Sequence, residues 1–144
     1  MISIPPLYSH PRVVAFQDID AAGIVFFARI FEYFHDAYVA QLAARGVQLA
    51  DTLRSRAWGA PLVHAEADYR KPMHFGDRID VDIVSATLGD TSMTVHYSVR
   101  AGSADARELA VGKTVHVFID PSTGTPRAIP PEVRAAFSAP VPTA

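Results

Sequence analysis

The segment Ile24–Arg45 constrains the fold more than any other part of the chain, because it contains neither proline nor glycine. Glu32, Asp36 and Gln41 lie largely off the apolar stripe, and a glycine follows Arg45, as is typical where a helix ends after a basic last turn. The apolar stripe has helical spacing and consists of Ile30, Phe31, Phe34, Ala37, Tyr38 and Leu42. We therefore expect a long helix over 24–45 whose aromatic face packs against a sheet.

Most of the remaining chain predicts strands and turns. Residues 1–10 contain two adjacent prolines and predict a loose lead-in, and Arg12–Ile19 is rich in β-branched and aromatic residues, which favours a strand. Val47–Trp58 includes a possible short helix, and Pro131–Phe137 a closing helical turn. Four further strand-like segments follow the long helix: Pro61–Arg70, Arg78–Leu88, Ser92–Arg100 and Glu108–Ile119.

This order of elements defines the expected fold class. One strand, one long helix and four strands in a meander predict an α+β fold in which an antiparallel sheet covers the helix with one face. The length of 144 residues fits a single domain over 1–144, with an ordered core over about 12–126. Uncovered edges and an uncovered outer face of so small a sheet favour a homo-oligomer.

The composition excludes several classes of function. The chain has no cysteine and a formal net charge of −2, so we expect no thiolate metal site, no cysteine nucleophile and no nucleic-acid partner. We find no apolar run of membrane-spanning length, no phosphate-binding glycine loop and no G-x-S-x-G motif. We accordingly expect a cytoplasmic protein with no membrane partner, no metal and no cofactor.

The segment Asp18–Gly23 joins the first strand to the long helix and is the first candidate for chemistry. A carboxylate there lies near the positive end of the helix dipole, whose free backbone N–H groups can polarise a substrate carbonyl. The carboxylate can attack that carbonyl or activate water, and Gly23 lets a substrate approach the backbone. Two other interpretations stay open, namely that Asp18 and Asp20 only form a turn and a helix cap, or that they hold a metal with substrate phosphates.

The histidines are the second group of candidates. A lone histidine is usually a satisfied surface or half-buried residue, and this structural interpretation applies to each of His35, His64, His74, His96 and His116. His64 and Glu66 have the spacing that places them on the same face of a strand, where they form either an acid–base pair or part of a solvent-exposed face.

The sequence Phe16–Phe27 (FQDIDAAGIVFF), followed by an aromatic helix, resembles the active-site segment of the 4-hydroxybenzoyl-CoA thioesterase family. The resemblance extends from Arg12 to Pro126 and implies the hotdog fold, an antiparallel sheet wrapped around one long central helix. It also implies hydrolysis of an aromatic acyl-CoA to the free acid and CoA, so that coenzyme A is part of the substrate. Within the family the chain is most similar to the cyanobacterial 1,4-dihydroxy-2-naphthoyl-CoA hydrolase branch, through residues 35–38, 61–65, 76–77 and 116–121.

The resemblance assigns roles to individual residues. Asp20 is implied as the nucleophile or general base, and a backbone N–H at or next to Phe27 as the group that polarises the thioester carbonyl. The implied substrate-binding residues are Gly23, His35, Ala60, Pro61 and His64. The 4-hydroxybenzoyl branch has a basic cluster for CoA phosphates where this chain has Leu88–Thr91, so Arg70, Lys71 and Arg78 are candidates for that role by charge alone.

The family also implies an assembly, a dimer or a dimer of dimers with pockets at the dimer interface. Two other functions stay open on the sequence, one of them hydrolysis of short or medium aliphatic thioesters of CoA or of an acyl-carrier protein. The other is an acyl-CoA-binding module without catalysis. A hotdog dehydratase or hydratase would need His with Asp or Glu in motifs that this chain does not contain.

Overall fold

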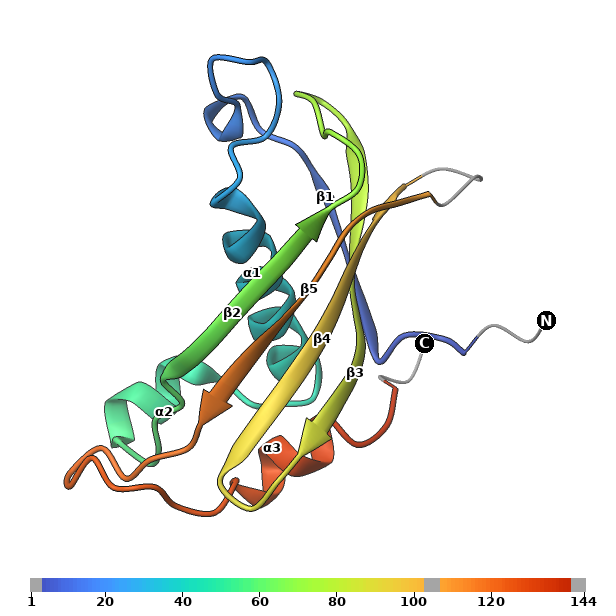
Figure 1. Ribbon diagram of the computed structural model, residues 1–144. Coiled ribbons are helices and arrows are strands. Elements are labelled where there is room, and N and C mark those ends of the chain that lie inside the picture. The colour runs from blue at the N-terminus through green and yellow to red at the C-terminus, as the bar shows by residue number, and fades with distance from the viewer. Residues whose placement is uncertain (1–3, 103–106, 141–144) are drawn as a thin grey trace.

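The computed structural model describes residues 4–102 and 107–140, so residues 1–3, 103–106 and 141–144 of the expected domain lie outside the described part. Figure 1 shows a curved sheet that wraps around the helix α1, with the short helices α2 and α3 near one end of it. In chain order the elements are β1 (Tyr8–Val13), the 3-10 helix η1 (Phe16–Asp18), α1 (Arg29–Ala44), α2 (Leu49–Ser55), β2 (Leu62–Tyr69), β3 (Arg78–Leu88), β4 (Ser92–Ala101), β5 (Glu108–Val117) and α3 (Pro131–Ala136).

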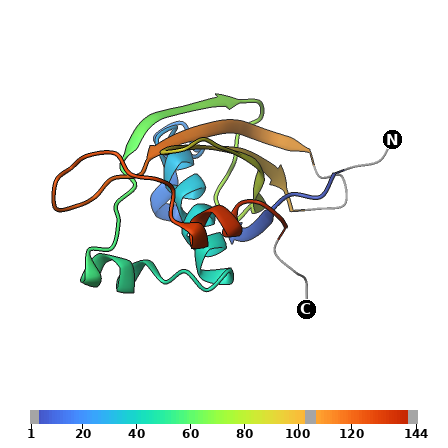
Figure 2. The same cartoon turned by 90° about the horizontal axis from the view of Figure 1, so that it is seen from below.

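The sheet is antiparallel and has the strand order β1-β3-β4-β5-β2. The α+β class is confirmed, but the predicted four-strand meander is wrong, because β2 pairs with β5 and not with β3. Only β3, β4 and β5 form a meander, and β1 pairs with β3 at one edge. Seen from below, the sheet covers α1 from one side (Figure 2). β2 is the edge strand at the end of the sheet opposite to β1.

The first strand lies earlier in the chain than predicted. It spans Tyr8–Val13, and the predicted strand end at 16–18 is the 3-10 helix instead. Pro11 is tolerated within β1 because the strand lies at the sheet edge, where a missing N–H interrupts no second ladder.

The long helix begins at Arg29, five residues later than Ile24, and ends at Ala44 as expected. The preceding residues are extended because Val25 N–H donates to Met73 O at 2.9 Å and Phe26 N–H to Asp18 O at 2.8 Å. These bonds join segments far apart in sequence, so no local pattern could reveal them. Gly46 ends the helix with a φ of 85°, in agreement with the prediction.

The apolar stripe of α1 packs on the concave face of the sheet. Phe34 stacks on Tyr97 of β4, with ring centroids 4.4 Å apart and an interplanar angle of 9°. Gly112 of β5 permits this approach, because a Cβ there would lie 2.5 Å from Cε2 of the Phe34 ring. The prediction that Gln41 lies off the buried stripe is wrong, since Gln41 is fully buried and donates to Ala136 O at 2.7 Å.

The C-terminal helix α3 closes one end of the core. Val133 and Phe137, which lie beyond residue 126, are buried with the residues of α1 and the sheet. In the part of the chain that the structure describes, no helix combines the length and apolar character needed to cross a bilayer.

Candidate active site

Asp20 opens a tight turn in front of α1. Gly23 N–H donates to Asp20 O at 3.0 Å, and Gly23 has a φ of 83°, a left-handed conformation that favours glycine. The side chain takes part as well, since Asp20 Oδ1 accepts a 2.8 Å hydrogen bond from Ala22 N–H. Among the described residues, Asp20 Oδ2 has no hydrogen-bond partner, so one carboxylate oxygen is fixed while the other is available to a substrate or to water.

Asp18 has the opposite environment to Asp20. It is 3% exposed and accepts a 2.8 Å hydrogen bond from the hydroxyl of Tyr33 on α1. Arg12 and Arg29 lie within ion-pair distance of its two oxygens, at 3.8 and 3.6 Å. Asp18 is therefore committed to holding β1, η1 and α1 together, and neither aspartate caps the helix, whose N-cap residue is Ala28.

Phe27 lies two residues before α1, directly in front of the N-cap. Its carbonyl accepts a hydrogen bond from the Tyr69 hydroxyl, whereas its N–H donates to no acceptor among the described residues. The first N–H groups of α1 are already used, since Arg29 N–H donates to Phe26 O at 2.9 Å. Among the described residues, the unpaired N–H groups next to the positive end of the helix therefore belong to Phe27 and to the N-cap residue Ala28.

Asp20 and Phe27 line one cavity of about 350 Å³, which we call the Asp20 pocket. Its other walls are Ile24, Val25, Tyr69, Arg70, Lys71, Pro72 and Met73. The pocket thus places a half-buried carboxylate and the helix-start backbone against the end of β2.

His35 and Ala60 lie in a different cavity, of about 160 Å³, which we call the His116 pocket. It is lined by Phe31, His35, Ala60, Leu62, Tyr97, Thr114 and His116. Sequence reasoning missed Tyr97 and Thr114 and took His116 as structural. The available signal was the i, i+2 spacing of Thr114 and His116, which places both on one strand face.

The two remaining predicted residues lie at the start of β2. Pro61 O accepts a 3.1 Å hydrogen bond from Val117 N–H, which joins this segment to β5. His64 is exposed, with Nε2 3.3 Å from Glu66 Oε1, so the predicted same-face pair is confirmed. Lys113 lies 3.1 Å from the same carboxylate, and hydrogen bonds from Lys113 and His64 lower the pKa of Glu66. The pair therefore belongs to a solvent-exposed ion-pair network.

Within one chain, four of the predicted site residues therefore line two separate pockets, Asp20 and Phe27 in one and His35 and Ala60 in the other. The Asp20 pocket includes Tyr69, the last residue of β2, and the His116 pocket includes Leu62, the first residue of that strand. One chain does not bring Asp20 together with His35 and Ala60.

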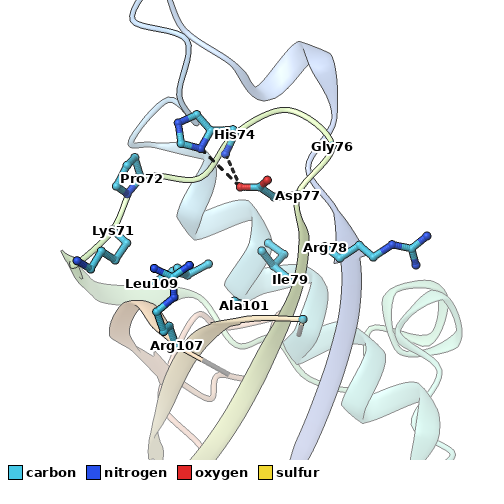
Figure 3. Close-up of a pocket in the computed structure, with 11 residues that line it drawn as sticks. Lys71, Pro72, His74, Gly76, Asp77, Arg78, Ile79, Ala101, Arg107 and Leu109 are labelled. Carbon is cyan, nitrogen blue, oxygen red and sulfur yellow. Dashed lines mark hydrogen bonds and ion pairs between the residues drawn. The ribbon is translucent and has the colours of Figure 1, made fainter. Parts of the chain in front are cut away.

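A third cavity, of about 630 Å³, adjoins the Asp20 pocket through Lys71 and Pro72, and we call it the basic pocket. Its wall includes Lys71, His74, Asp77, Arg78 and Arg107 (Figure 3). His74 N–H donates to Asp77 Oδ2 at 2.8 Å, so the one acidic group of this wall is engaged within the protein. Among the described residues, no cluster of three or more His, Asp or Glu side chains is arranged to hold a metal ion.

An antiparallel sheet that closes on one long helix, with a carboxylate turn ahead of that helix, is the hotdog fold of thioester-cleaving enzymes. Residues 14–137 match the model of the thioesterase-like superfamily, and the chain belongs to this superfamily.

Individual relatives agree with this assignment. The chain is 37% identical over 114 residues to the 1,4-dihydroxy-2-naphthoyl-CoA hydrolase of Rippkaea orientalis, a match that covers 79% of this chain and 83% of that protein. The solved 1,4-dihydroxy-2-naphthoyl-CoA thioesterase from Synechocystis superposes with a TM-score of 0.84 at 27% identity, covering 90% of this chain and 94% of that one. Gentisyl-coenzyme A thioesterase BH1999 superposes with a TM-score of 0.77 at 26% identity, covering 90% of this chain and 98% of the other.

Proposed function

We propose that this protein hydrolyses an aromatic acyl-CoA of the hydroxybenzoyl or dihydroxynaphthoyl type to the free acid and CoA. The observation that carries the proposal is the Asp20 pocket, where a carboxylate with one unpaired oxygen faces the same cavity as the unpaired N–H region of Phe27. Relatives and solved neighbours named for aromatic CoA thioesters support the substrate class.

The reaction needs few polar side chains. The thioester carbonyl accepts a hydrogen bond from the Phe27 N–H, which stabilises the oxyanion that forms when the carbonyl is attacked; one such donor contributes about 2.7–4 kcal/mol. Asp20 Oδ2 either takes a proton from the attacking water or attacks the carbonyl itself. When the C–S bond breaks, CoA leaves as a thiolate that takes up a proton, and the acyl carbon retains the new C–O bond. If water attacked, this bond already belongs to the free acid; if Asp20 attacked, water then hydrolyses the mixed anhydride, which releases the acid and restores the Asp20 carboxylate.

A second copy of the chain completes the site in this proposal. β2 is an edge strand, and Leu62, Val63 and Tyr69 are 52%, 59% and 47% exposed. Antiparallel pairing of two β2 strands about a twofold axis places the Tyr69 end of one strand beside the Leu62 end of the other. The Asp20 pocket of one protomer then adjoins the His116 pocket of its partner, which reunites the two groups of predicted residues. We also expect, from the family resemblance, that two such dimers associate, and we propose from the composition that the protein is cytoplasmic.

The basic pocket is the site that we propose for the phosphates of CoA. Lys71 and Pro72 line both this pocket and the Asp20 pocket, so the two cavities lie next to each other. Lys71 and Arg107 supply positive charge on its wall, whereas the side chain of Arg78 points away from them (Figure 3). Phosphates are bound well by lysine and arginine side chains. Arg70, the third candidate by charge, lies in the Asp20 pocket.

A panel of CoA thioesters tests the proposal, with release of free thiol as the measurement. The panel contains benzoyl, 4-hydroxybenzoyl and 1,4-dihydroxy-2-naphthoyl esters beside acetyl, butyryl and octanoyl esters. We expect kcat/KM to be highest for the aromatic group. Preference for the aliphatic esters would overturn the aromatic assignment, and tight binding of all esters without turnover would show a binding module instead of an enzyme.

A further inference from the structure

A chain of hydrogen bonds runs along the buried wall of the His116 pocket. The Tyr97 hydroxyl lies 3.0 Å from Thr114 Oγ1, and Thr114 Oγ1 lies 3.0 Å from His116 Nε2. His116 Nδ1 in turn lies 3.4 Å from the carbonyl oxygen of Ala60. All three side chains are less than 9% exposed, at 3%, 6% and 5% respectively, and all three line the cavity.

The direction of each of these hydrogen bonds follows from the last one, between His116 and Ala60. A backbone carbonyl only accepts, so His116 Nδ1 carries the proton and donates it to Ala60 O. Burial lowers the pKa of His116, which keeps the ring neutral and leaves Nε2 as an acceptor. Thr114 therefore donates to Nε2, and Tyr97 in turn donates to Thr114.

Two stacking contacts with α1 hold the chain in place. Tyr38 stacks on His116 with ring centroids 4.7 Å apart and an interplanar angle of 2°. Phe34 stacks on Tyr97 in the same way, at 4.4 Å. These contacts hold the rings of Tyr97 and His116 in place, so that the order of donors and acceptors along the hydrogen bonds sets their direction.

Each donor of the chain is thus used internally, and what remains toward the cavity is a set of oxygen lone pairs on Tyr97 and Thr114. The half-buried Phe31 and the exposed Leu62 add apolar surface to the cavity, and His35, which also lines it, is exposed. A cavity of this volume is close to the ~150 Å³ that accommodates a benzene ring.

We infer that Tyr97 and Thr114, held by His116, select an acyl group whose aromatic ring carries a hydroxyl, because they can accept its proton but cannot donate one. A ring without the hydroxyl leaves the lone pairs of Tyr97 and Thr114 unpaired, and a ring with an acceptor in its place meets them with repulsion. This inference rests on the proposed hydrolysis of aromatic acyl-CoA and assigns its ring specificity to residues that otherwise take no part in it.

The test compares each of the 2-, 3- and 4-hydroxybenzoyl-CoA esters with the fluoro isomer of the same position, since fluorine is small and cannot donate. We expect kcat/KM for at least one hydroxy isomer to exceed that of its fluoro counterpart by about tenfold or more. Thr114→Val releases the Tyr97 proton toward the cavity, and Tyr97→Phe removes one acceptor, so both lower this ratio. Thr114→Ser keeps the hydroxyl and retains the ratio.

Two further measurements separate this inference from stability effects and from the proposed function. Thr94→Val on β4 is the control for a threonine exchange outside the cavity, and thermal melting shows which variants fold. Binding of the corresponding phenacyl-CoA analogues, whose methylene between carbonyl and sulfur prevents hydrolysis, gives the same ratio without turnover. The inference would be overturned if kcat/KM were equal for the hydroxy and fluoro esters at all three positions. It would also be overturned if the hydroxy-to-fluoro ratio of kcat/KM were unchanged in both Thr114→Val and Tyr97→Phe. Hydrolysis of all these esters at similar rates would leave the proposed thioesterase function standing.

Discussion

The hydroxyl of Tyr33 donates a 2.8 Å hydrogen bond to the carboxylate of Asp18, and both side chains are buried. This contact attaches the N-terminal half of α1 to the segment that carries Asp20. Burial, together with the bond to Asp18, raises the pKa of Tyr33, so the phenol stays protonated and donates throughout the neutral range. Asp18 is therefore engaged in holding the fold, whereas the catalytic role is proposed for Asp20, two residues later.

Tyr33→Phe is expected to lower the free energy of unfolding by about 1–3 kcal/mol, because it leaves a buried carboxylate with one donor fewer. Urea unfolding measures the change. Tyr8→Phe is the control, since the Tyr8 hydroxyl has no hydrogen-bond partner among the described residues. A Tyr33→Phe protein as stable as the wild type would contradict the structural role of this pair.

Asp20→Asn is expected to leave the fold intact and to reduce kcat by about 10²–10⁴-fold, the range for loss of a positioned base. The amide can still accept the hydrogen bond from Ala22 N–H, so the turn is retained. Thiol release and thermal melting are measured side by side, with Asp51→Asn on α2 as an exposed control. Near-normal turnover of Asp20→Asn would exclude Asp20 as the catalytic group.

Much of this arrangement could be predicted from local patterns, and the errors share one cause. The strand β3 has the predicted bounds, because alternation of apolar residues is a local signal. The late start of α1 at Arg29 and the burial of Gln41 depend on bonds to Met73 and Ala136, which lie far away in the sequence. The pairing of β2 with β5 is likewise a contact between distant segments.

The candidate site also depends on contacts between distant segments, which local patterns do not reveal. Asp20 and Gly23 form a recognisable turn motif, and the structure supports the turn. Tyr97 and His116 come from two different strands, and their common link through Thr114 depends on the register of β4 against β5. No single segment of the sequence contains that chain of hydrogen bonds.

Lys71→Ala is expected to raise KM for a CoA thioester by several fold while leaving hydrolysis of the N-acetylcysteamine thioester of the same acid unchanged. The short thioester lacks the CoA phosphates, so only the CoA ester loses the attraction of the basic pocket. Added salt weakens the same attraction and reduces the difference between wild type and variant. Arg54→Ala, on exposed α2, is the control. Equal losses for both thioesters would place Lys71 in the acyl part of the site instead.

Val63→Lys is expected to disrupt the proposed pairing of two β2 strands, because it places a charge at a 59% exposed apolar position of an edge strand. Light scattering coupled to size-exclusion chromatography gives the mass of the particle, and thiol release gives the activity. We expect a smaller particle and a large loss of activity together. The exposed Leu53 of α2 provides the control, Leu53→Lys, which we expect to change neither. A monomeric wild type with full activity would contradict the shared site.

The neutral state of His116 predicts a specific pH dependence of stability. Burial lowers the pKa of this ring below the usual value of 6.5, and proximity to His35 lowers it further, whereas the bond to Ala60 O acts in the opposite direction. At pH values between the folded and the unfolded pKa of His116, the unfolded protein binds more protons than the folded protein. The free energy of unfolding therefore falls as the pH falls below about 6.5. The slope cannot exceed about 1.4 kcal/mol per pH unit for this one group.

Urea unfolding at pH 7.5, 6.5 and 5.5 measures this pH dependence of stability. His116→Gln is expected to be less stable at pH 7.5 and to lose most of the decrease between pH 7.5 and 5.5, whereas His96→Gln retains it. An unchanged decrease in His116→Gln would show that the ring is not held neutral, and would also remove the basis for the proton order assigned to Tyr97 and Thr114.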